Sequence, residues 1–239
     1  MNKPMAGPMV LSVLMLAGYA GYLWTRPETA ATTQAGFFDP PATGVVRVVT
    51  WNLERGDKDA GVSLSAEAIR HIADLLDRLA PSTVLLQGLV SDADAEAIRA
   101  GLSGEWVGES VPRRRDGEQH LAIFVRQSME PLDQVLINTV VGDRALAYHV
   151  GGVNGVAYRF ICMHAESTDA EQRRRYCDGV LEWLERQRPM LTVLAGDFGV
   201  DVGARTSEDG TKSAIGRMSE RLVDCGPAGV ATIQGGGRV

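Results

Sequence analysis

The sequence predicts an α/β fold in which two mixed β-sheets pack together and helices cover their outer faces. Residues 190–195 form an uninterrupted apolar or β-branched run, which is typical of a strand buried on both faces. Residues 45–51 and 83–87 are further short runs of this kind, and residues 66–79 between them carry apolar side chains at helical spacing. Along the chain, strands and helices alternate first, several short strands follow, and a helix and a strand come after them. This order favours two packed sheets with helices outside.

The other expected elements are taken from local signals in the same way. The helix over residues 66–79 stops before Pro81, and Ser91 is placed to cap a second helix over residues 92–102. In the strand over residues 156–164, alternation puts Phe160, Cys162 and His164 on one face. We also expect strands over residues 106–109, 120–126, 134–138 and 144–150, and helices over residues 169–186 and 215–222.

Composition and charge restrict the class of partner. The chain has 239 residues, 45% of them hydrophobic, and a formal net charge of −6, so it is long enough to bury a large core. An acidic surface repels phosphate backbones, so nucleic acid is a possible partner that the net charge does not favour. The three cysteines are too few for a disulfide framework, and their spacing matches no zinc pattern.

The first 26 residues indicate a membrane or export segment. Residues 5–24 are uncharged and mostly apolar, long enough to cross a bilayer, and lie between Lys3 and Arg26. We expect residues 1–26 to be a membrane anchor, with a cleaved signal peptide as the alternative. Residues 27–44, rich in Ala, Thr and Pro, form the expected linker to a domain over residues 45–239 on the extracytoplasmic side.

Four polar residues stand where expected strands end. They are Asn52 in TWNLERG, Gln87 in VLLQG, His164 in CMHAES and Asp197 in AGDFG. Each alone has an ordinary explanation, since Asn and Asp form turns and a histidine can be a hydrogen-bonded core residue. Ligands of α/β sheets bind beyond the strand ends, so we expect these side chains to line a common pocket.

This ordered set of motifs resembles the endonuclease/exonuclease/phosphatase family of metal-dependent phosphodiesterases. The similarity extends over residues 45–239 and includes the LAIFVR strand in mid-chain. It implies a four-layered α/β sandwich and attack of water on a phosphate ester with Mg²⁺ or Mn²⁺. By this resemblance, Asn52 holds metal and phosphate, His164 donates to phosphate oxygens, and Asp197 positions the water and binds metal. These roles suit the chemistry, because hard cations prefer oxygen ligands and developing negative charge needs fixed donors.

The chain also departs from the family pattern. The family has a metal-binding glutamate after the glutamine of the second strand, where this chain has Gly88, and an asparagine after Gly-Asp-Phe, where it has Gly199. The family ends on a strand with an Asp-His pair, whereas this sequence ends in Gly-Gly-Gly-Arg-Val, so we expect the domain to lack its last strands. Glu54, two residues after Asn52, and Asp201 are the nearby carboxylates that offer a substitute metal ligand.

Two other motifs have weaker support. The Asp-Phe-Gly tripeptide at residues 197–199 also occurs in protein kinases, but no kinase catalytic loop or glycine-rich loop accompanies it. Cys162 is expected to be a buried apolar residue rather than a nucleophile. Arg113, Arg114 and Arg115 lie in an expected loop, either as a solvated surface cluster or as contacts for an anionic substrate.

Three functional hypotheses follow from the sequence. The first is a membrane-tethered, metal-dependent phosphodiesterase or phosphatase with an incomplete active site and little activity. The second is a non-catalytic sandwich that binds a phosphorylated ligand or a protein partner. The third is a truncated product whose open sheet edge lowers its stability.

Overall fold

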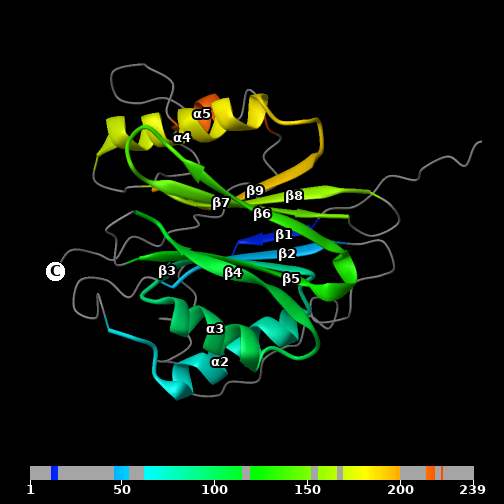
Figure 1. Cartoon of the computed structure of the whole chain (residues 1–239). Helices are drawn as coiled ribbons and strands as arrows, with labels where there is room; N and C mark the ends of the chain where they lie inside the picture. Colours follow the sequence, from blue (N-terminus) through cyan, green and yellow to red (C-terminus); the bar gives the residue numbers. More distant parts are fainter. Residues whose placement is uncertain are drawn as a thin grey trace, which may run out of the picture.

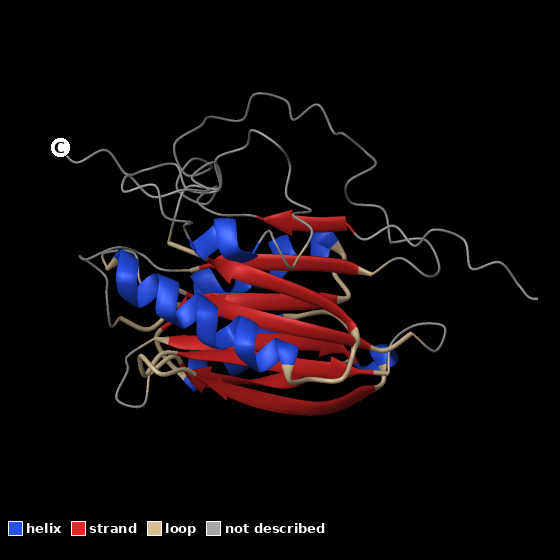
Figure 2. Cartoon of the chain, turned by 90° about the horizontal axis from the view of Figure 1, so that it is seen from above, coloured by secondary structure: helices blue, strands red, loops and turns tan. Residues whose placement is uncertain are grey.

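Two β-sheets packed face to face make up the core of the computed structural model, which describes residues 12–15, 46–53, 62–114, 119–151, 156–165, 169–199, 214–218 and 222. The first sheet has the strand order β1-β2-β3-β5-β4, and the second has the order β6-β7-β8-β9 (Figure 1). Seen from above, the strands run in broadly similar directions, as in aligned sheet packing (Figure 2). The strands are β1 (Ser12–Met15), β2 (Arg47–Asn52), β3 (Thr83–Leu89), β4 (Trp106–Pro112), β5 (His120–Arg126), β6 (Pro131–Asn138), β7 (Arg144–Val150), β8 (Tyr158–His164) and β9 (Leu191–Asp197).

Helices cover the outer faces of both sheets, so the described part of the chain has the four layers that the sequence led us to expect. Helices α2 (Ala66–Leu79) and α3 (Asp92–Gly101) pack on the first sheet. Helix α4 (Ala170–Glu185) and the short α5 (Ala214–Met218) pack on the second (Figure 1). A 3₁₀ turn, η2 (Gln127–Met129), joins the first sheet to the second.

A polar side chain caps the start of each of the three longer helices, and Ser91 is the cap that the sequence predicts. The Ser65 hydroxyl accepts a hydrogen bond from the Ala68 N–H at 3.1 Å, and the Ser91 hydroxyl accepts one from the Asp94 N–H at 3.2 Å. The Asp169 carboxylate does the same for the Glu171 N–H at the start of α4, at 2.9 Å. These side chains satisfy backbone donors that have no partner within the first helical turn, so the predicted helix starts are confirmed.

Side-chain alternation along the strands assigns each residue to one of three apolar layers. In β8, Phe160 and Cys162 lie in the core between the sheets, while Ile161 and Met163 face α4. The predicted division of this strand is therefore confirmed. In β9, Val193 and Ala195 face the inter-sheet core, but Leu191 is 45% exposed. The expectation that this whole run is buried on both faces is wrong at its start, because β9 is the outermost described strand of its sheet.

Two parallel strand pairs bring the polar strand ends together. β2 and β3 are parallel with Asn52 opposite Gln87, and β8 and β9 are parallel with His164 opposite Asp197. Parallel neighbours end at the same side of a sheet, and Asn52, His164 and Asp197 are the last residues of their strands, whereas β3 continues two residues beyond Gln87. We call this end of the sandwich, where β2, β3, β8 and β9 finish, the strand-end edge.

Part of the expected membrane segment is a strand in this structure. β1 pairs in parallel with β2, with Ser12 opposite Arg47 and Met15 opposite Thr50. Among the described residues, no helix is both long and apolar enough to span a bilayer. The other residues of the expected anchor and the expected linker lie outside the described residues, so the anchor stays a prediction.

Gly196 is required by the close approach of β9 to β8. Its φ is +143°, and an added Cβ would collide with the Met163 carbonyl. We expect Gly196→Ala to lower the free energy of unfolding by about 3 kcal/mol, from backbone strain and overpacking together. Gly142→Ala is the matched control, because Gly142 also has a positive φ (+86°) but no atom within 4 Å of an added Cβ. Urea denaturation measures both, and equal losses would contradict the prediction.

Candidate functional site at the strand-end edge

A hydrogen bond between the two sheets joins two of the predicted site residues. The Asn52 side-chain N–H donates to Asp197 Oδ2 at 2.7 Å, although the residues are 145 positions apart in sequence. The second carboxylate oxygen, Oδ1, accepts the Gly199 N–H, also at 2.7 Å. Both residues are half-buried. The predicted meeting of Asn52 and Asp197 is therefore confirmed, and the carboxylate is fixed from both sides.

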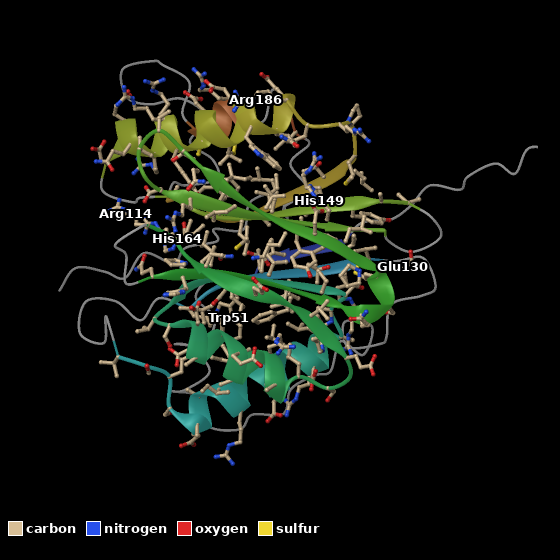
Figure 3. The ribbon with its side chains drawn as sticks, in the orientation of Figure 1. Trp51, Arg114, Glu130, His149, His164 and Arg186 are labelled. Carbon is tan, nitrogen blue, oxygen red and sulfur yellow. The ribbon has the colours of Figure 1, made fainter. Side chains whose placement is uncertain are left out.

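His164 is the third predicted site residue at this edge. It stands opposite Asp197 in the pairing of β8 with β9, and its side chain is nearly buried. Its backbone N–H donates to the Tyr176 hydroxyl of α4 at 3.3 Å. Burial raises the pKa of Tyr176 well above its ordinary value, so this hydroxyl stays protonated. Figure 3 shows His164 at the same end of the sandwich as Arg114, with Glu130 at the opposite end.

Gln87 points into the core between the sheets instead of outward. Its side-chain N–H groups donate to Thr50 Oγ1 at 3.1 Å, to the Leu85 carbonyl at 3.2 Å and to Cys162 Sγ at 3.0 Å. It thus ties the first sheet to β8 of the second. Burial raises the pKa of Cys162 to about 12, so the thiol is uncharged and a poor nucleophile, consistent with its expected role as a buried apolar residue.

Arg144 is a residue of this edge that the sequence analysis missed. β7 and β8 are antiparallel with Leu146 opposite Cys162, and continuing this register by two residues puts Arg144 opposite His164. Both contact Tyr176, whose hydroxyl donates to the Arg144 carbonyl at 2.9 Å. Arg144 lies on the same strand face as Leu146, toward the other sheet. Its local sequence, Asp-Arg at a strand start, carries no signal of this position, because the position depends on strand register.

The Arg144 guanidinium has a buried donor that lacks an acceptor. Its Nε is inaccessible to solvent and makes no hydrogen bond to any residue that the structure describes. Buried donors in folded proteins are nearly always hydrogen-bonded, because an unmet donor costs about 1–3 kcal/mol. An acceptor at this position would satisfy the donor.

The arginine cluster after β4 differs from the expected solvated loop. Arg113 is only 7% exposed, and its Nη1 donates to Gln119 Oε1 at 2.8 Å. Arg114 donates through Nε to Asp143 Oδ1 at 2.5 Å. The prediction of a solvated cluster is wrong for Arg113. The residues next to Arg113 in sequence do not indicate that it is buried or that it lies near an acidic side chain. Arg115, like Glu54 and Asp201, lies outside the described residues, so the structure does not place the expected substitute metal ligands.

Few metal-binding side chains come together in the described part of the chain. No group of three His, Cys, Asp or Glu side chains in the described ranges is arranged to hold a metal ion. Asp197 is a carboxylate joined to Asn52, and Mg²⁺ is usually held by one or two carboxylates together with substrate phosphates. Gly88 supplies no ligand where the family resemblance expects a glutamate, and its φ of +69° is one that other residues rarely adopt.

Known proteins resemble this chain in structure but not detectably in sequence. No family model and no curated protein matches the sequence. Among solved structures, the endonuclease/exonuclease/phosphatase from Bacteroides vulgatus is 18% identical over 64% of this chain and 66% of its own, with a TM-score of 0.54. The mannosyl-6-phosphatase from Bacteroides thetaiotaomicron is 19% identical over 64% and 65%, with a TM-score of 0.52. The human Nocturnin catalytic domain is 16% identical over 74% and 70%, with a TM-score of 0.55.

The chain therefore has the endonuclease/exonuclease/phosphatase fold, a fold used by phosphoric ester hydrolases. It spans about two thirds of the length of the structures it matches. The resemblance of the sequence to this family is confirmed at the level of the fold. The catalytic and metal-binding roles of Asn52, His164 and Asp197 stay predictions.

Placing a carboxylate at position 88 should strengthen metal binding. A charge about 4 Å from a cation contributes several kcal/mol before desolvation, so we expect Gly88→Glu to bind Mn²⁺ at least about tenfold more tightly than Gly88→Gln. The glutamine variant is the matched control, since both replacements bear the same strain of a positive φ, about 1 kcal/mol. Isothermal titration calorimetry with MnCl₂ measures the difference. Equal affinities would show that position 88 does not reach the ion.

Proposed function

We propose that this protein binds phosphate esters at the strand-end edge and hydrolyses them slowly. The observation that carries the proposal is the buried Nε of Arg144, which has no acceptor in the described part of the chain. The backbones of Arg144 and His164 both bond to the Tyr176 hydroxyl, so the two residues are neighbours. An arginine next to a histidine offers several donors to one tetrahedral anion, which is the pattern that phosphate recognition needs. The endonuclease/exonuclease/phosphatase fold supports a phosphate ester as the ligand.

Each residue of the site has a separate part in the proposed reaction. Arg144 and His164 donate to the non-bridging phosphate oxygens and stabilise the negative charge that grows during attack. Asp197 accepts a hydrogen bond from the attacking water, and Asn52 keeps the carboxylate in position through the 2.7 Å contact. The glutamate that the family resemblance expects as a ligand for Mg²⁺ or Mn²⁺ is Gly88 in this chain, so we propose slow turnover.

Removing the side chain of Asp197 or of His164 should abolish most of the turnover of phosphate esters. We expect Asp197→Ala and His164→Ala each to lower kcat/KM for bis(4-nitrophenyl) phosphate or 4-nitrophenyl phosphate by about 10²–10⁴-fold, measured with added MgCl₂ or MnCl₂. Asp133→Asn is the control, because Asp133 accepts from His149 at 2.7 Å on a different part of the second sheet. Turnover that survives in both alanine variants would come from another site or a contaminant.

A second candidate function is binding without catalysis. It is favoured by Gly88, which leaves the described part of the site one carboxylate poorer than the family resemblance implies. In this case the same donors hold a phosphorylated ligand and no hydrolysis follows. Phosphate binding that persists in EDTA, in a protein that turns over neither substrate with added metal, would select this candidate.

We further propose that residues 5–24 tether the domain to a membrane, with the domain on the extracytoplasmic side. The support is the uncharged apolar run between Lys3 and Arg26. Pairing of β1 with β2 and membrane insertion are alternatives for residues Ser12–Met15. We expect the full chain to stay in the membrane fraction after alkaline carbonate extraction and a chain starting at Val45 to be released. Release of both would contradict the tether.

A further inference from the structure

Asp143 is a fully buried carboxylate in the turn that leads into β7. Its Oδ1 accepts the hydrogen bond from Arg114 Nε at 2.5 Å and lies 3.6 Å from Arg113 Nε. Its backbone carbonyl accepts from both the N–H and the hydroxyl of Thr139, at 3.1 and 2.6 Å, which closes the turn. The carboxylate is thus held between two arginines at a fixed point of the backbone, as buried charges require.

These contacts join the two sheets beside the strand-end edge. Arg113 and Arg114 follow β4 of the first sheet, whereas Asp143 precedes β7 of the second. An isolated antiparallel bridge pairs Arg114 with Asp143, and the Arg144 N–H donates to the Arg113 carbonyl at 2.8 Å. The Asp143 carboxylate therefore lies where the segment after β4 of the first sheet contacts the start of β7 in the second sheet.

Arg144 is the next residue, and its backbone is held on both sides. The N–H bonds to the Arg113 carbonyl, and the carbonyl accepts from the Tyr176 hydroxyl at 2.9 Å. The same hydroxyl accepts from the His164 N–H. A binding group on a fixed backbone loses less conformational freedom when a ligand arrives, so this arrangement prepares Arg144 to receive an anion.

We propose that Asp143 is a positioning residue for phosphate binding. By holding Arg113 and Arg114 against the start of β7, its buried carboxylate keeps Arg144 beside His164, where the guanidinium meets the phosphate. Asp143 itself does not touch the ligand. The inference rests on the proposed function, because it takes the phosphate site at Arg144 as its starting point.

A double-mutant cycle on phosphate binding tests this role. Inorganic phosphate is titrated in EDTA by calorimetry into the full-length wild type, Arg144→Met, Asp143→Asn and the double variant, below the melting temperature of each. We expect about a tenfold or greater loss of affinity for Arg144→Met and about fivefold for Asp143→Asn. If Asp143 acts through Arg144, the double variant binds no more weakly than Arg144→Met, within about twofold.

Two further variants separate positioning from a general loss of stability. Asp133→Asn also removes a carboxylate that is paired with a neighbouring side chain, and its phosphate affinity should equal that of the wild type. Arg114→Gln breaks the contact from its more exposed side, where Arg114 is 41% exposed, and replaces Asp143→Asn in the cycle if that protein does not fold. It should show the same non-additivity with Arg144→Met.

The outcomes distinguish the two proposals. Additive losses in the cycle, or an unchanged affinity in Asp143→Asn, overturn the positioning role while phosphate binding by the wild type stands. A wild type that neither binds phosphate nor hydrolyses its esters overturns the proposed function, and the inference about Asp143 fails with it. Non-additive losses together with an unaffected Asp133→Asn support the inference.

Discussion

The hydrogen bond from Asn52 to Asp197 depends on the face-to-face packing of two sheets that share no strand in the described structure. Such a bond to a carboxylate typically contributes about 1.5–3 kcal/mol, and here it also fixes where two strands end relative to each other. Gln87 reinforces the same arrangement from inside, because its amide bonds to Thr50 in its own sheet and to Cys162 in the other. The geometry of the site is therefore a property of the sheet packing.

Some polar groups near this edge hold the two sheets together, and others lie at the strand ends. Gln87 and Cys162 are buried between the sheets and hold them together, so they are not available to a ligand. Asn52 and Asp197 are half-buried and lie at the ends of their strands. Arg144 belongs to the neighbouring strand β7, and its buried Nε has no acceptor among the described residues. In the described part of the chain, the edge thus brings together a carboxylate, an imidazole and a guanidinium, the groups on which the proposed phosphate-ester site depends.

The backbone conformation at position 88 favours the glycine that this chain has in place of a glutamate. β3 changes register between Leu86 and Leu89, and Gly88 lies at this irregularity with a positive φ. A glutamate would be strained there in the present backbone, so the glycine and the local conformation are consistent with each other. Slow catalysis or pure binding both fit this arrangement, and the proposed measurements separate them.

The sequence alone determined the Ser91 cap, most strand positions, and the strand ends that hold Asn52, His164 and Asp197, whereas β3 continues two residues beyond Gln87. These features follow from local patterns, since apolar alternation and capping residues act over a few positions along the chain. Only the tertiary structure decided that Gln87 turns inward, that Arg144 stands opposite His164, and that Arg113 is buried near Asp143. Those outcomes depend on strand register and on which strand of one sheet packs over the other, and no local pattern in the chain encodes such long-range pairing.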